Sequence, residues 1–394
     1  MSSPFTTHGR EALIVEALRT PMGKSHAERG WYRDTHPNEM LGAVYTALLE
    51  RTGVSPETVE DLVIGCTAPF GEQSRNIGRN AWLQAGYPAE VPATVLDRRC
   101  GSAQTAVEMA AALVASGTHD IAIAGGVEHM GHVPMNSPAK ISELYGEPWP
   151  AELRARYDFV TQGESAELIA DKWGITRGQM DEFATRSHRL ATEALESGRF
   201  DREMIPYLLD GETRRSDQTI RPGTSMETLA GLKTVFRPEN GRITAGTSSP
   251  ISDGAAGVLL ASRTAADRYG LTPRARILDQ TTVGVDPILM LTGPIPATRK
   301  LLERTGLTIN DIDLFEINEA FSSVVLAWEQ ELKPDMDHVN VNGGAIAMGH
   351  PVGATGARLF GTLLAEMERR DVELGLITMC CGGGLGTATL VQRI

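Results

Sequence analysis

One of the chain's four cysteines, Cys100, lies where a strand pattern gives way to a helix pattern. Residues 97–106 have the sequence DRRCGSAQTA, so small residues follow the thiol and let another backbone or a ligand come close. The free N–H groups at a helix start lower a thiol pKa and so favour a thiolate nucleophile. A cysteine packed as a small hydrophobe is the alternative, and the residues alone leave both interpretations open.

His350 lies in a glycine-dense segment, residues 342–358, with the sequence NGGAIAMGHPVGATGAR. Pro351 suits the first turn of a helix that follows. A histidine held there can polarise a thiol or donate a hydrogen bond to an oxyanion. So many glycines cost stability unless backbone must approach something closely, which favours function over a structural or solvated histidine.

Cys380 and Cys381 open a third segment, CCGGGLG, which ends at Gly386. A dinucleotide-binding loop is excluded by context, because only eight residues follow Gly386 and no helix and second strand fit. A vicinal disulfide is the other alternative. A thiol beside free glycine N–H groups can act as an acid or base, and the amides can stabilise an oxyanion.

Two further polar motifs carry weaker signals. The carboxamide of Asn318, in the sequence NEAF that follows a strand pattern, is placed to hold a water or ligand, although a surface turn explains the motif alone. Ser249, Asp253 and Gly254 fit a turn at a helix start without any function.

The elements that must position these residues follow an α/β pattern. Apolar runs predict buried strands at 12–17, 62–66, 121–125 and 313–317, and periodic segments predict helices at 40–51, 104–116, 164–172 and 177–198. The alternation favours mostly parallel sheets. Residues 210–218 are predicted to form a polar loop.

A faint internal repeat organises the chain. Residues 53–64 resemble 306–317, and each of Cys100 and His350 precedes a helix and then a glycine-ended strand. Two pairs in the same order favour duplication of one unit. We therefore expect an N-terminal half formed by residues 1–124 and 251–274, an inserted loop domain at 125–250, and a C-terminal half at 275–394.

The composition of the chain argues against several classes of function. The 394 residues carry a net charge of −13, which argues against a nucleic-acid or anionic-membrane surface. There is no apolar run of 18 residues, the first ten residues lack the apolar core of a signal peptide, and the last five match no peroxisomal signal. Four cysteines without C-x-x-C or zinc spacing predict a reducing cytoplasm and no metal site.

Taken together, these motifs resemble the thiolases over nearly the whole chain. The segment at 343–358 is close to that family's GGAIALGHPxGxxGxR, and the other motifs follow in family order. The resemblance implies a thiolase fold, in which two similar βαβ-rich halves form a five-layered αβαβα core with an inserted loop domain. The closest likeness is to actinobacterial β-oxidation and steroid-degradation thiolases, on three short segments: residues 71–73, 291–298 and 335–337.

The same resemblance implies roles for individual residues. Cys100 is expected to accept the acyl group, with His350 lowering its pKa and contributing to an oxyanion hole, and Cys380 acting as the acid/base. Asn318 is expected to hold a water in that first oxyanion hole, and the N–H groups of Cys100 and Gly382 to form a second. The remaining expected contacts are with CoA, which is a co-substrate and not a permanent cofactor: Ser249, Arg221 and Phe321.

The expected activity is cleavage of 3-ketoacyl-CoA by CoA to acetyl-CoA or propionyl-CoA and a shortened acyl-CoA. Residues 161–167, TQGESAE, differ from the His-Met-Gly pattern of acetoacetyl-specific members, which favours a medium, branched or ring-bearing acyl chain. The alternatives are a biosynthetic acetoacetyl-CoA thiolase, a ketoacyl-synthase-like condensing enzyme and a non-catalytic acyl-CoA-binding protein. A homodimer or homotetramer is expected, and a dehydrogenase is disfavoured because no strand–GxGxxG–helix unit occurs.

Overall fold

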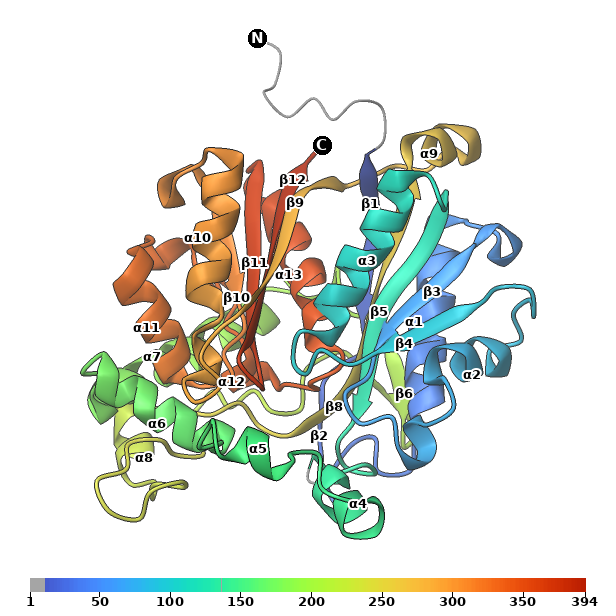
Figure 1. Ribbon diagram of the computed structural model, residues 1–394. Coiled ribbons are helices and arrows are strands. Elements are labelled where there is room, and N and C mark those ends of the chain that lie inside the picture. Colours follow the sequence, from blue (N-terminus) through green and yellow to red (C-terminus); the bar gives the residue numbers. More distant parts are fainter. Residues whose placement is uncertain (1–10, 136) are drawn as a thin grey trace.

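The structure, a computed structural model, describes residues 11–135 and 137–394, and within them ten strands form one mixed sheet (Figure 1). Nine of these strands follow the order β10-β11-β12-β9-β1-β8-β5-β3-β4, and β2 pairs with β8. Their bounds are β1 Ala12–Arg19, β2 Gly23–Lys24, β3 Asp61–Gly65, β4 Ala93–Leu96, β5 Ile121–His129, β8 Ser252–Ser262, β9 Ala275–Gly284, β10 Leu314–Ile317, β11 Leu374–Cys381 and β12 Leu385–Arg393.

The sheet consists of two parts with the same internal order. In the first half β3 is parallel to β5, which is antiparallel to β8, which is antiparallel to β1. In the second half β10, β11, β12 and β9 repeat that arrangement. A short antiparallel pairing of β1 with β9, at Leu13–Arg276 and Ile14–Ala275, joins the halves. The predicted pair of similar halves is therefore confirmed.

The repeated sequence at 53–64 and 306–317 has the same local structure in both copies. Gly53 ends α1 (Pro37–Thr52) with φ +70°, and Gly306 ends α10 (Pro294–Thr305) with φ +71°. Each glycine adopts the left-handed conformation that a helix end favours. A short 3-10 turn and then a buried strand follow in both places, β3 in the first half and β10 in the second.

Helices and sheet alternate in five layers (Figure 1). The helices α1 and α2 (Ile77–Gln84) cover the outer face of the first half, whereas α10 and α11 (Ser322–Leu332) cover that of the second. Between the two parts of the sheet lie α3 (Ser102–Ser116) and α13 (Thr355–Arg370). These two middle helices touch closely: a Cβ added at Gly356 would lie 2.2 Å from the backbone nitrogen of Gln104. The predicted α/β fold with five layers is confirmed.

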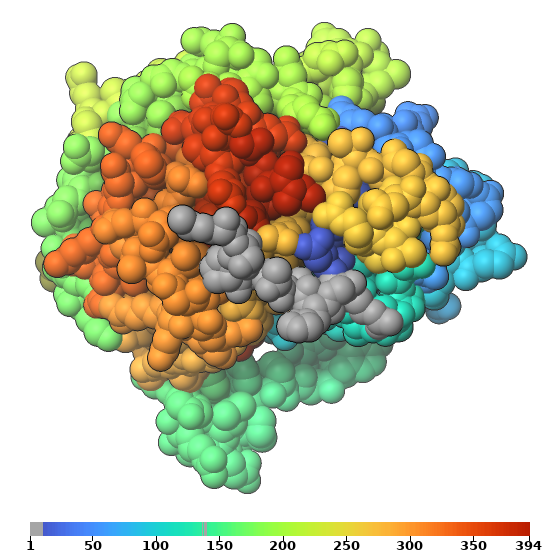
Figure 2. Space-filling model, turned by 90° about the horizontal axis from the view of Figure 1, so that it is seen from above, coloured from blue at the N-terminus to red at the C-terminus, as the bar shows by residue number. Residues whose placement is uncertain are grey.

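The segment between β5 and β8 lies along one edge of this core, at the bottom of Figure 1. Figure 2 shows its first part, which contains α4, projecting from the rounded body. The boundary predicted at residue 125 falls inside β5, and the division of the chain into three parts stays a prediction. The elements of the segment are α4 Ser137–Tyr145, α5 Ala151–Arg154, α6 Gln162–Lys172, α7 Arg177–Glu196, β6 Tyr207–Leu209, β7 Glu212–Arg214 and α8 Met226–Ala230. The two remaining helices of the described chain are α9 Arg263–Tyr269 and α12 Ala345–Met348.

Two local predictions were wrong. Residues 210–218 are not simply a loop, because β6 and β7 form a hairpin whose turn is Asp210 and Gly211, both with positive φ. An Asp-Gly pair suits this turn, since its two central positions need the left-handed region. Asp253 and Gly254 do not start a helix but lie in β8, where the Asp253 carboxylate accepts a hydrogen bond from the Gly131 N–H at 2.9 Å.

The first ten residues, whose polarity argued against a signal peptide, lie outside the described residues. In the part of the chain that the structure does describe, none of the helices has the length and apolar character needed to cross a bilayer. The same residues contain no group of three or more His, Cys, Asp or Glu side chains suited to hold a metal ion.

Candidate active site

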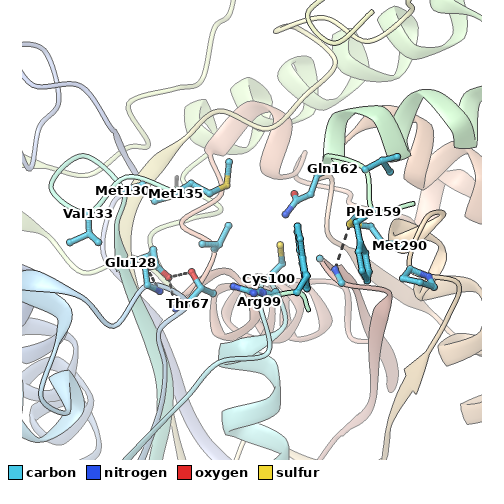
Figure 3. Close-up of a pocket in the computed structure, with 17 residues that line it drawn as sticks. Thr67, Arg99, Cys100, Glu128, Met130, Val133, Met135, Phe159, Gln162 and Met290 are labelled. Atoms are coloured by element: carbon cyan, nitrogen blue, oxygen red, sulfur yellow. Dashed lines mark hydrogen bonds between the residues drawn. The ribbon is translucent and has the colours of Figure 1, made fainter. Parts of the chain in front are cut away.

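A cavity of about 360 Å³ opens beside Cys100, between the core and the inserted segment (Figure 3). Its wall comes from both halves and from the segment around α5 and α6, so sequence-distant residues meet there. Most of the wall is apolar, and the described lining residues are Thr67, Ala68, Arg99, Cys100, Glu128, Met130, Val133, Met135, Trp149, Phe159, Val160, Gln162, Pro287, Met290, Val352, Gly382 and Gly383.

Cys100 lies in a tight turn two residues before the first residue of α3. The turn is held by hydrogen bonds from the N–H of Gly101 to the Arg98 carbonyl and from the N–H of Ser102 to the Arg99 carbonyl. Burial raises the pKa of the Cys100 thiol to about 11, although hydrogen bonds from the N–H groups of Gly382 and Cys100 lower it. The expected net lowering by the helix start was wrong, because desolvation of the thiolate outweighs these donors.

His350 is buried and held at both ring nitrogens. Its Nδ1 lies 2.6 Å from the Thr355 hydroxyl, which itself donates to the Pro351 carbonyl at 2.9 Å. The hydroxyl proton is thus used, so Nδ1 carries the ring proton and donates it to Thr355. This leaves Nε2 as an acceptor, 3.3 Å from the amide nitrogen of Asn318.

Electrostatics keep this imidazole neutral. Burial, together with the nearby positive charge of Arg358, lowers the pKa of His350 to about 3. A neutral ring with its lone pair at Nε2 can accept a proton that is transferred during a reaction, but it gives no permanent positive charge to stabilise a thiolate. The high thiol pKa of Cys100 is consistent with a neutral neighbour.

Cys380 and Asn318 lie at the ends of neighbouring strands. Because β10 and β11 are parallel, their carboxyl ends meet at one edge, and the Asn318 N–H donates to the Thr378 carbonyl at 3.0 Å. Burial raises the pKa of Cys380, and a charge on Cys100 raises it further, so the two thiols interact. All four cysteines, each within the described residues, are free thiols, so the alternative of a vicinal disulfide at Cys380 and Cys381 was wrong.

The predicted CoA contacts are not among the described residues that line the cavity. The N–H of Ser249 donates to the Ala320 carbonyl at 3.0 Å, next to a bridge between Ser248 and Phe321, so Ser249 and Phe321 are neighbours. Arg221 is exposed on the inserted segment, and its backbone N–H donates to Nδ1 of His188 at 3.2 Å. No described contact joins Arg221 to Ser249 or Phe321.

Several residues of the site were missed from the sequence. Thr355, which orients His350, gave no signal because its contact depends on how α13 begins. Trp149 and Phe159 stack with ring centroids 4.8 Å apart and line the cavity, but they come from a polar stretch without clear periodicity. Arg99 could have been noticed because it is the residue next to Cys100.

Comparison with known protein families then shows to which family the chain belongs. The model of the thiolase N-terminal domain matches residues 12–264, and that of the thiolase C-terminal domain matches residues 271–393. The chain belongs to the thiolase family. This confirms the predicted family and the acyl-CoA acyltransferase class of enzyme for this thiolase.

Individual relatives resemble this thiolase over nearly its whole length. The steroid 3-ketoacyl-CoA thiolase FadA6 of Mycobacterium tuberculosis is 43% identical over 402 residues, covering 99% of this chain and 97% of the relative. A 3-ketoacyl-CoA thiolase of Idiomarina loihiensis is 45% identical over 394 residues, covering 98% and 100%. The crystal structure of the Bacillus anthracis acetyl-CoA acetyltransferase superposes with a TM-score of 0.89 at 35% identity, covering 98% and 99%.

Proposed function

We propose that this thiolase cleaves a 3-ketoacyl-CoA with CoA, yielding acetyl-CoA or propionyl-CoA and a shortened acyl-CoA, through an acyl group carried on Cys100. The observation that carries the proposal is the pair of interacting, buried free thiols, Cys100 and Cys380, of which Cys100 lines a mostly apolar cavity. The names of the relatives, several of which are 3-ketoacyl-CoA thiolases, support the same activity.

In the first half-reaction the Cys100 sulfur attacks the ketone carbon of the substrate, and the thiol proton moves to Nε2 of His350. The bond between C2 and C3 then breaks, and its electron pair forms the enolate of acetyl-CoA. Cys380 protonates that carbon, so acetyl-CoA leaves and the acyl group stays on Cys100. A neutral His350 suits this step, because it accepts a proton only as the sulfur attacks.

In the second half-reaction the Cys380 thiolate takes the proton of the incoming CoA thiol. The CoA sulfur attacks the acyl carbon, the bond to Cys100 breaks, and Cys100 recovers its proton from His350. Negative charge develops on a carbonyl oxygen in both steps. The N–H groups of Cys100 and Gly382, and a water held by Asn318, are assigned to stabilise it.

CoA is proposed as a co-substrate that enters past Ser249 and Phe321, with Arg221 meeting its nucleotide end. These residues lie outside the cavity wall, so the CoA part and the acyl chain of the substrate take different sides of Cys100. An anionic ligand suits a local arginine in a chain whose overall charge is −13.

The acyl chain is proposed to be larger than four carbons. The cavity of about 360 Å³ is larger than a short acyl chain fills, and the stacked Trp149 and Phe159 offer a flat apolar wall. The name of the Mycobacterium tuberculosis relative supports a ring-bearing or branched chain. A sharp preference for acetoacetyl-CoA in cleavage assays would favour the biosynthetic alternative instead.

We also propose a homodimer or homotetramer in the cytoplasm. The strand β4 is an edge of the large sheet, and an edge strand can pair with a second copy. Four free thiols suit a reducing compartment. Light scattering coupled to size-exclusion chromatography measures the assembly, and a monomeric mass would contradict it.

The decisive experiment is mass spectrometry of the protein after brief exposure to a 3-ketoacyl-CoA. We expect an acyl adduct on the peptide that contains Cys100 and no adduct on that peptide in C100A. Release of acetyl-CoA without an adduct would contradict the covalent route. Binding of acyl-CoA without any turnover would support a non-catalytic acyl-CoA-binding protein.

A further inference from the structure

The residue before the nucleophile has an unusual backbone conformation. Arg99 has φ +51°, in the left-handed region that residues with a side chain rarely adopt. Such a conformation persists only where surrounding contacts enforce it, and here the turn before α3 does so. The result is that the Arg99 side chain lines the cavity next to Cys100 (Figure 3).

The guanidinium of Arg99 is almost unused by the protein. Its single described ion pair places Nη1 3.5 Å from Oδ2 of Asp97, with no hydrogen bond from the guanidinium among the described residues. The side chain is 53% exposed. A guanidinium has five N–H donors in a fixed fork. Most of the donors of Arg99 are therefore free to bind a group outside the chain.

A second polar group with free donors faces the same space. The side-chain amide of Gln162 has no described hydrogen-bond partner, and its nitrogen lies 2.9 Å from the position of a Cβ added at Gly382. The Arg99 Cγ lies 3.8 Å from that same position, so both side chains flank the Gly382 backbone. Figure 3 shows Gln162 across the cavity from Cys100 and Arg99.

The other charged residue of the described lining does not compete for Arg99. The carboxylate of Glu128 accepts hydrogen bonds from the N–H of Thr67 at 2.8 Å and its hydroxyl at 2.6 Å, and from the Gln73 amide at 2.9 Å. Its oxygens are therefore occupied within the protein, and burial raises its pKa. Among the described lining residues, Arg99 is therefore left as the one positive charge of a mostly apolar wall.

We propose that Arg99, with Gln162, selects 3-ketoacyl-CoA substrates whose acyl chain carries a second carboxylate, that is, monothioesters of dicarboxylic acids. This inference rests on the proposed thiolase activity. A carboxylate accepts two parallel hydrogen bonds from a guanidinium and a further one from an amide. The phosphates of CoA are not the partner, because Arg99 is adjacent to Cys100 and the pantetheine arm separates the reacting thioester from the phosphates.

The test compares matched substrates in the thiolysis assay. Pairs of 3-ketoacyl-CoA esters of six to ten carbons end either in a carboxylate or in a methyl group, and a third set ends in a neutral amide. We expect the wild-type kcat/KM to favour the carboxylate by about tenfold or more at one chain length. R99Q should lose that preference, chiefly because its kcat/KM for the carboxylate-ended substrate falls. R99K should keep part of the preference.

A matched control separates charge recognition from backbone effects. Arg75 also has a positive φ, +55°, and is exposed outside the cavity, so R75Q removes an arginine of the same conformation and should keep the preference. A wild-type preference for the methyl-ended esters overturns the inference. An equal loss on all substrates in R99Q also overturns it, because Arg99 would then act on Cys100. Absence of thiolysis with every ester would instead contradict the proposed function.

Discussion

The two halves share one fold and carry different chemistry at the same places. Cys100 precedes α3 in the first half, and His350 precedes α13 in the second, so the nucleophile and the imidazole occupy corresponding loops. The strand that follows each helix ends differently: β5 ends in Glu128 and His129, whereas β11 ends in Cys380 and Cys381. At these corresponding places the halves differ in their side chains and not in the order of helix and strand.

This difference indicates how the steps of the proposed reaction are divided between the two halves. The first half offers one sulfur to carry the acyl group. The second offers His350 and Cys380, which move protons, and Asn318, which holds a water. None of these groups carries a permanent charge in the buried site, since burial lowers the pKa of His350 and raises that of both thiols. The following variants probe this division, from the largest expected effect to the smallest.

The largest effect is expected when the first half loses its sulfur. C100A should lower thiolysis at least about 10³-fold, because no other group takes over the covalent step. C66A removes a buried thiol from the same half and should change the rate little. Initial-rate assays measure both, and comparable losses in the two variants would contradict the assignment of Cys100.

A smaller loss is expected when the second half loses its imidazole. H350Q should slow formation of the acyl-enzyme by about 10²- to 10³-fold, the range that a general base contributes. His338 is exposed in the same half, so H338Q is the matched control. Rapid-quench measurement of the first turnover separates acylation from product release. Unchanged acylation in H350Q would assign proton transfer elsewhere.

The contact between the halves can be broken without touching the reacting groups. G356A should lower the free energy of unfolding by about 1–3 kcal/mol, because its Cβ would meet the Gln104 backbone at 2.2 Å. G361A in the same helix meets nothing nearer than 3.3 Å and should cost much less. Urea denaturation measures both, and equal midpoints would show that the middle layer tolerates a wider spacing.

At neutral pH the smallest effect comes from the charge state of His350, which changes stability only as the pH falls below about 6.5. The pKa of His350 is about 3 when folded, below its usual value of about 6.5 when unfolded. As the pH falls from 6.5 towards 3, the unfolded chain binds a proton that the folded chain does not, so the free energy of unfolding falls by up to about 1.4 kcal/mol per pH unit. H350Q should lack this contribution in urea titrations. If the free energies of unfolding of wild type and H350Q change with pH in parallel, the prediction is wrong.

Much of the fold could be predicted from the sequence, because its signals are local. The helix-ending glycines, Gly53 and Gly306, and the apolar runs after them mark the same units in both halves. The hairpin of β6 and β7 was missed although Asp210 and Gly211 carry a recognised turn signal, because the polar residues around them resemble a loop.

The site was only partly predictable, because its properties depend on packing. The glycine-rich segments correctly marked the loops that carry Cys100 and His350. The predicted direction of the pKa shift of Cys100 was wrong. The sequence shows a helix start but does not show the desolvation, which has the larger effect on the pKa. The unused donors of Arg99 and Gln162 become visible only when the cavity brings residues 99 and 162 together.

The short pairing of β1 with β9 has a consequence for how such a molecule could arise. It joins two equivalent units edge to edge, and α3 and α13 then meet as the contact surfaces of a pair would. In a symmetric pair made from one gene copy, both surfaces must change together. Once the units are fused in one chain, each surface can change alone, so one can keep a sulfur while the other acquires an imidazole.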